Sequence, residues 1–194
     1  ARPLLDDASA VMPVVRGRIE RRVAFDGPIG QQVAFYGKPG SRTARQSHET
    51  EAVLNAATLM LNDWSQGKPA AQSTLAALAR MFELQRSDGG WSWIQFHLEP
   101  WEAGNDDWGL ALAALAIGLA PKSVQATHRD GVSKLVQRIH ARFDRMRHFD
   151  KVLLLWASRH LPAVLTVSEA TAVARALTAL QRPDGAWSTF TLIG

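Results

Sequence analysis

The segment between Trp91 and Trp108 mixes acidic and aromatic side chains more densely than any other part of the chain. Carboxylates can give or take protons, and tryptophan rings can stack on sugars or stabilise cations through their π faces. The segment joins two predicted helices and is long for such a connection, which favours a functional role. The candidate substrate-binding and proton-transfer side chains are Trp93, His97, Glu99, Trp101, Glu102, Asp106, Asp107 and Trp108.

One hypothesis for this segment is glycan chemistry. Glu99 and Glu102 offer the two carboxylates that glycoside hydrolysis requires, and Trp93 and Trp101 would serve as platforms for sugar rings. The spacing of the two glutamates is unspecific, because acids bound by nearby arginines or backbone groups would give the same pattern. The glycan-active interpretation is therefore one alternative among several.

Metal binding is not expected. His97 and Glu99 supply two potential ligands, and two ligands do not make a site. His48 lies beside Glu49 and Glu51, and the same argument applies there. The chain has no cysteine, which excludes disulfides, a thiolate nucleophile and cysteine-bound zinc in this sequence.

Two stretches of the chain repeat one pattern, a helix followed by a turn and a tryptophan. Residues 85–92 read QRSDGGWS and residues 181–188 read QRPDGAWS, each after an apolar helical run. Glycine permits the tight turn, and the tryptophan ring then returns to a neighbouring helix. Such a unit cannot bury its own apolar stripe, so copies must stack. The repeated residues are Gln85, Gly89, Trp91, Gln181, Gly185 and Trp187.

The pattern Gln-x-x-x-Gly-x-Trp after a helix resembles the QW repeat of the terpenoid cyclases, the squalene–hopene and oxidosqualene cyclases. Residues 50–56, 96–102 and 152–158 also look like a bacterial branch of squalene–hopene-cyclase-like proteins. The similar segments cover roughly residues 47–194. The resemblance implies an α/α toroid in which the glutamine and tryptophan of each repeat tie adjacent helix pairs together.

The resemblance also implies a reaction, the isomerisation catalysed by class II terpene cyclases. Their Asp-x-Asp-Asp motif protonates an alkene or epoxide in a dry cavity lined by aromatic rings. Asp106 matches the proton donor and Asp107 its neighbour, but Gly104 replaces the first aspartate and removes a carboxylate that should tune the donor. In the alternative without catalysis, Asp107 caps the following helix and Asp106 stabilises its positive end.

The predicted fold is all-α, a partial α/α toroid of about six helices. Residues 1–45 are rich in proline and glycine and are predicted to be an irregular arm or linker, in which residues 11–23 could form a short helix. Residues 46–194 are predicted to form the helical domain with both QW-type repeats. Its helices are expected at residues 49–64, 72–85, 107–119, 130–146 and 149–160, and from a Thr166–Glu169 capping box to the second repeat turn.

About six helices make half of a twelve-helix toroid and would leave an apolar concave wall exposed. Large exposed apolar surfaces usually bind a partner. We therefore expect another protein chain, a missing segment, or a lipid or membrane surface to cover this wall. This expectation supports the alternative to a cyclase, a non-catalytic helical scaffold or assembly subunit of a larger complex.

The composition is that of a globular protein, with 46% hydrophobic and 21% charged residues. The net charge of +4 is modest and gives no expectation of nucleic-acid binding. The arginines near the N-terminus are predicted to be solvated. The main basic cluster is predicted to line a solvated outer helix, with contact to anionic lipid or an acidic partner as the alternative. It comprises Arg138, Arg142, Arg145, Arg147 and Lys151.

The resemblance bears on cofactor and location as well. In this bacterial branch, a Cys-x-x-Cys-His stretch that attaches haem c is expected just upstream of a sequence such as Ala1-Arg2-Pro3. No cofactor is expected in the present chain, and haem c is expected only on such an upstream segment. An exported or periplasmic location is slightly favoured on the same ground.

Overall fold

The computed structural model describes residues 2–24, 34–96 and 105–193. Within these residues the fold is all-helical, as predicted, and contains no strand. The helices are α1 (Arg2–Ala24), α2 (Arg42–Ser65), α3 (Gln72–Glu83), α4 (Asp107–Leu119), α5 (Lys122–Thr127), α6 (Arg129–Arg142), α7 (His148–Ser158), α8 (Val167–Leu180) and α9 (Thr189–Ile193).

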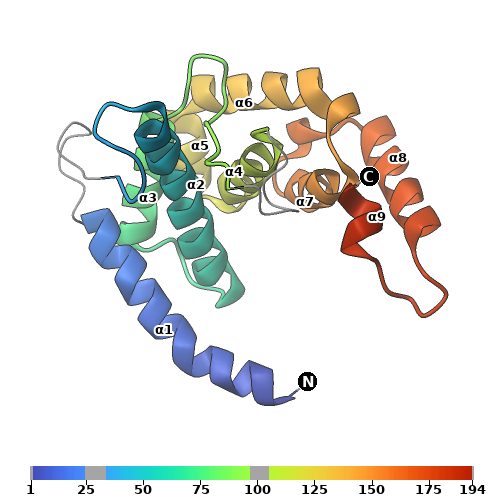
Figure 1. The fold of residues 1–194 in the computed structure, drawn as a ribbon, viewed down its shortest axis with the longest axis horizontal. Helices are drawn as coiled ribbons and strands as arrows, with labels where there is room; N and C mark the ends of the chain where they lie inside the picture. Colours follow the sequence, from blue (N-terminus) through green and yellow to red (C-terminus); the bar gives the residue numbers. More distant parts are fainter. Residues whose placement is uncertain (1, 25–33, 97–104, 194) are drawn as a thin grey trace.

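Helix α4 is the central element of the fold (Figure 1). It packs between α2 and α7, and these three helices pair with α3, α6 and α8 in turn. Its alanine and leucine side chains are buried on almost every face, as the sequence predicts for a core helix. The described residues thus form a row of three helical hairpins, while the toroid itself stays a prediction.

The two repeat turns have the same internal geometry. Gly89 and Gly185 adopt positive φ angles of 85° and 82°, which glycine reaches without steric cost. The side-chain amides of Gln85 and Gln181 donate to the carbonyl oxygens of Gly89 and Gly185, each at 2.8 Å. One turn follows α3 and the other follows α8, so equivalent turns leave two of the three hairpins.

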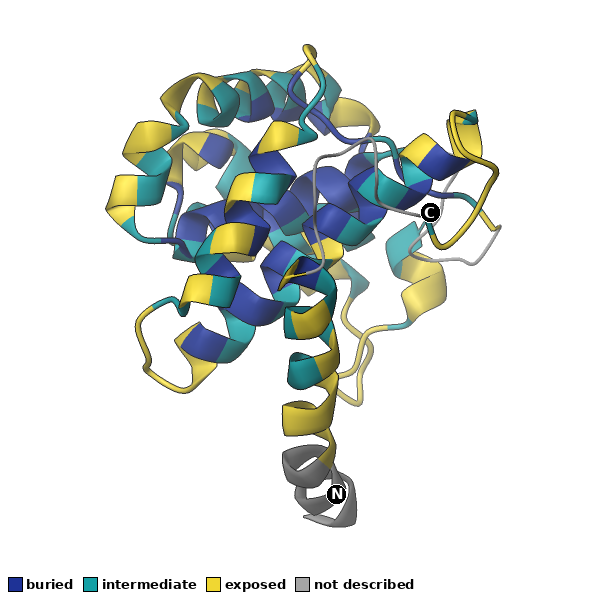
Figure 2. Cartoon of the chain, turned by 90° about the vertical axis from the view of Figure 1, so that its left-hand side faces the viewer, coloured by how far each residue is buried: buried dark blue, intermediate teal, exposed yellow. Residues whose placement is uncertain are grey.

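The region predicted as an irregular arm, residues 1–45, is instead helical over Arg2–Ala24 and from Arg42 onward, and the short helix considered for residues 11–23 is part of α1. Pro13 lies inside α1 and removes one backbone hydrogen bond, but tertiary contacts stabilise the C-terminal half of the helix. Arg16 donates to Asp63 of α2 at 2.6 Å, and Val23 is buried in the core. Figure 2 shows the coloured part of α1 leaving the body of the molecule, where residues 11–15 are exposed.

The predicted boundaries of the later helices need small corrections. The capping box at Thr166 and Glu169 is present and begins α8, as predicted. The helix expected over residues 130–146 ends at Arg142 and continues as a short 3₁₀ turn. Only Leu135 and Ile139 are fully buried in α6, which agrees with its prediction as an outer helix.

Candidate functional site

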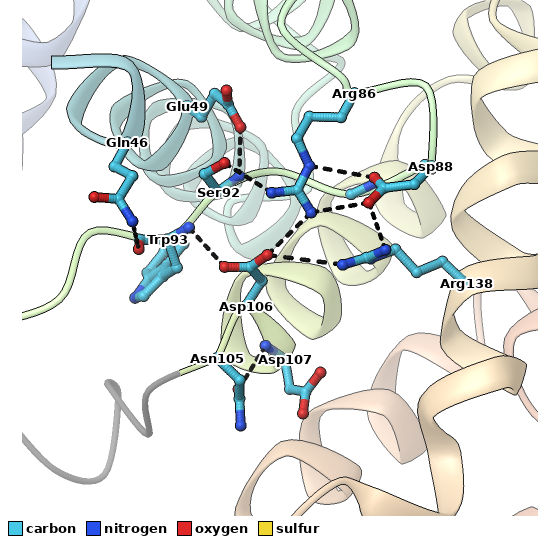
Figure 3. A network of polar contacts seen from close by, with 12 residues as sticks. Gln46, Glu49, Arg86, Asp88, Ser92, Trp93, Asn105, Asp106, Asp107 and Arg138 are labelled. Carbon is cyan, nitrogen blue, oxygen red and sulfur yellow. Dashed lines mark hydrogen bonds and ion pairs between the residues drawn. The ribbon is translucent and has the colours of Figure 1, made fainter. Parts of the chain in front are cut away.

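A polar network surrounds Asp106, the residue just before α4 (Figure 3). A guanidinium nitrogen of Arg86 lies 3.0 Å from Oδ2 of Asp106, and one of Arg138 lies 3.7 Å away. The backbone N–H of Trp93 donates to Oδ1 at 3.0 Å. The carboxylate therefore joins the first repeat turn, the start of α4 and the outer helix α6.

A second aspartate extends the network within the repeat turn. Asp88 accepts hydrogen bonds from Arg86 and, at 2.6 Å, from Arg138. Burial alone would raise the pKa of Asp88, but a hydrogen bond from the Gly90 N–H and the two guanidinium groups lower it below its usual value. The two arginines and two aspartates form one charge-balanced cluster that holds the turn against α6.

Asp107 is fully buried and is bound by Arg142 of α6. Arg142 donates to both carboxylate oxygens, at 3.0 Å to Oδ2 and through a shorter bond to Oδ1. The expected helix cap is wrong, because Asp107 is the first residue of α4 and its side chain binds another helix. Asn105 accepts the backbone N–H of Asp107 at 2.9 Å in its place.

These contacts decide what the two candidate acids can do chemically. Asp106 and Asp107 both face guanidinium groups, which complement a charged carboxylate rather than a protonated carboxyl. A donor that protonates an alkene must carry its proton into the reaction. The arrangement therefore suits helix-to-helix fixation better than acid catalysis.

Two further buried acids lie close to this region and were not among the predicted site residues. Glu49 of α2 accepts the backbone N–H of Ser92, and burial raises its pKa. Asp150 of α7 pairs with Arg147 at 3.1 Å, and burial again raises the pKa of the acid. Nothing in the local sequence signals the burial of Asp150, since its environment comes from neighbouring helices.

The interpretation of the basic cluster as a solvated surface is wrong for three of its members. Arg138, Arg142 and Arg147 each bind an aspartate. Arg138 and Arg142 lie four residues apart, so they share one face of α6 and point toward the start of α4. This spacing indicates that the two arginines share a helix face, but not which side chains they bind.

An aromatic cavity of about 600 Å³ lies between α1, α2 and the segment that leads from the first repeat turn to α4, and Glu51 is the acid in its wall among the described residues. Trp93 and Trp108, both predicted to bind substrate, are part of its wall, and Trp108 also stacks on Phe149 with ring centres 4.9 Å apart. Neither Asp106 nor Asp107 lines it. Its other apolar lining residues are Ile19, Phe35, Tyr36, Leu54, Ile94 and Phe96.

The remaining predicted residues, His97, Glu99, Trp101 and Glu102, lie outside the described residues. The glycan hypothesis rests on the two glutamates and stays a prediction. Across residues 2–24, 34–96 and 105–193, no three histidine, aspartate or glutamate side chains come together as metal ligands. In the same ranges, none of the helices is both long and apolar enough to cross a membrane.

Comparison with protein-family models, with curated proteins and with solved structures finds no match for this chain. The function is therefore argued from the geometry of the described residues.

Proposed function

We propose that this chain is a non-catalytic helical assembly module that accepts a further helix on its second repeat turn. On this proposal, the resemblance to terpenoid cyclases reflects a shared helical architecture and not a shared reaction. Terpenoid cyclisation is the second candidate function. The observation that carries the proposal is a difference between the two repeat turns. They have the same internal hydrogen bonds, but only the first is covered by a helix in the part of the chain that the structure describes.

Helix α6 covers the first turn. Gln85 donates at 2.9 Å to the carbonyl oxygen of Gly131 in α6, in addition to its bond within the turn. Gly89 lies against the backbone of Lys134, where a Cβ atom would collide with the carbonyl group. Trp91, two residues after Gly89, is completely buried. The turn and the helix thus fit each other through backbone contacts that need glycine.

The second turn presents the same groups to solvent. Gln181 donates to Gly185 at 2.8 Å, and no second acceptor for it lies among the described residues. Trp187 is 46% exposed and Phe190, in the adjoining α9, is 83% exposed. Exposed aromatic side chains beside an unused amide donor are what a docking helix would cover.

The first turn indicates the chemistry of the helix that would dock. Gly131 faces Gln85, and an added Cβ would lie 2.5 Å from the glutamine oxygen, so the partner needs glycine in its first turn. Gly90 faces Arg138, whereas Ala186 occupies the matching place in the second turn. The partner helix should therefore carry a small side chain where α6 carries Arg138.

A peptide with the sequence of residues 129–142 and the change Arg138→Ala is a direct probe of this surface, once a side-chain staple on its exposed face keeps it helical. Titration into the whole chain should shift the indole N–H resonance of Trp187 in a saturable way and leave that of Trp91 unchanged. The matched control peptide carries Gly131→Val. The proposal fails if Trp187 does not respond, or if both peptides act alike.

Cyclisation is tested separately by incubating the protein with squalene. We expect no cyclised product, because both candidate acids are paired with arginines. A product that disappears in Asp106→Asn would overturn the non-catalytic proposal and restore the cyclase hypothesis.

A further inference from the structure

We infer that the aromatic cavity beside α1 and α2 binds a long-chain fatty carboxylate, with the chain in the cavity and the carboxylate at Arg18. This inference does not rest on the proposed assembly function. The cavity involves α1 and α2, whereas the proposed docking surface lies on the turn after α8.

The walls of the cavity are apolar and open to solvent. Phe35 is 66% exposed, Tyr36 53%, Phe96 44% and Leu54 42%. Exposed large apolar side chains that gather around one cavity are a costly arrangement without a ligand. The volume of about 600 Å³ lies in the range of single small-molecule sites and suits an acyl chain.

Most polar groups that line the cavity already have partners within the protein. Ser47 accepts the backbone N–H of Tyr36 at 3.3 Å, and Thr50 accepts that of Ile94 at 2.8 Å. Arg22 binds Glu51 through both carboxylate oxygens. These groups offer little to a polyhydroxylated ligand, which would need many free hydrogen-bonding partners.

Two lining residues differ from the rest. Arg18 of α1 is exposed and forms no ion pair with any residue in the described ranges. The half-buried side chain of Asn55 makes no hydrogen bond there either. A guanidinium group without a counterion and a free amide donor, both beside an apolar cavity, complement an anionic head group.

The combination selects one ligand class. A neutral hydrocarbon would leave the charge of Arg18 unused, and a short anion would leave the aromatic walls uncovered. A long-chain carboxylate satisfies both features, because its chain displaces water from apolar surface while its head pairs with the guanidinium group.

The test measures binding of palmitate and hexadecanol by calorimetry, below the concentration at which either aggregates. The wild-type chain should bind palmitate with one-to-one stoichiometry, and hexadecanol about tenfold or more weakly, since a charge-assisted hydrogen bond is lost. Arg18→Met keeps an apolar stem and should weaken palmitate binding about tenfold while leaving hexadecanol binding unchanged.

Matched variants separate the alternatives. Arg21→Met removes an exposed charge from the same helix outside the cavity and should not alter binding. Leu54→Asp changes an exposed wall residue and should weaken both ligands. The inference is overturned if palmitate does not bind, if the Arg18 and Arg21 variants behave alike, or if the chain binds anionic lipid vesicles but not monomeric palmitate.

Discussion

Trp91 and Trp187 donate the same hydrogen bond in opposite environments. Each indole N–H reaches a carbonyl oxygen of the preceding helix at 2.7 Å, that of Met81 in one turn and that of Leu177 in the other. Trp91 is nevertheless 0% exposed and Trp187 46%. The hydrogen bond is therefore a property of the local turn, whereas the burial of the ring depends on what packs around that turn.

This difference predicts unequal costs for the same substitution. Trp91→Phe should lower the free energy of unfolding by about 2–3 kcal/mol, because it leaves a buried carbonyl without a donor and opens a cavity. Trp187→Phe should cost below about 1 kcal/mol, since water can reach its site. Urea unfolding at one pH measures both, and equal losses would contradict the description of the second turn as uncovered.

The two turn glycines form a second matched pair. Gly89→Ala and Gly185→Ala both place a side chain at positive φ, which costs about 1–2 kcal/mol. Only Gly89 also meets the backbone of Lys134 in α6, so its substitution should cost at least about 2 kcal/mol more. Chemical unfolding of the two variants measures the difference between their free energies of unfolding. Similar costs would mean that α6 does not cover the first turn closely.

Replacing Asp107 and replacing Arg142 should destabilise the protein by different amounts, although both changes break the same buried ion pair. Arg142→Met leaves an unpaired buried carboxylate and should cost about 3–5 kcal/mol of unfolding free energy. Asp107→Asn leaves Arg142 without its charged partner. Because the side chain of Arg142 is 30% exposed, water can reach it, and the free energy of unfolding should fall by less. The double variant should recover part of the loss. A double-mutant cycle without coupling energy would refute a direct pair.

Helix positions and repeat turns could be predicted from the sequence because they depend on local periodicity and turn chemistry. The Ala- and Leu-rich run at residues 107–119 forms a buried helix, and Thr166 begins α8 as its capping pattern indicates. Residues 1–45 do not follow their local composition, because contacts such as that of Arg16 with Asp63 stabilise α1, and such long-range contacts leave no mark on proline and glycine content.

The sequence indicates which segment holds the candidate site, but not which side chains bind one another within it. Asp106 and Trp93 do meet, through a backbone hydrogen bond. The two arginine partners of Asp106 could not be predicted, because Arg86 and Arg138 come from separate parts of the chain and meet only after the hairpins pack. Long-range pairing of this kind leaves no local pattern in a single sequence.

The attachment of α1 to α2 should depend on pH through Asp63. Burial alone would raise the pKa of Asp63, but hydrogen bonds from Thr74 and Ala71 and the guanidinium group of Arg16 hold it below its ordinary value. An acid with a lowered pKa in the folded state stabilises the fold above its unfolded pKa of about 3.9. That stabilisation is lost as the pH falls from this value through the lower pKa of the folded state.

Asp63→Asn tests this dependence. The variant should be less stable than wild type at pH 7 by about 1–3 kcal/mol, since it weakens a buried charge-assisted contact. It should also lose less stability than wild type between pH 6 and about pH 3, because the titrating group is absent. Asp184→Asn, which makes the same substitution at an exposed position in the second repeat turn, is the matched control. If Asp63→Asn and wild type lose equal stability in urea unfolding across this range, Asp63 does not link α1 docking to pH.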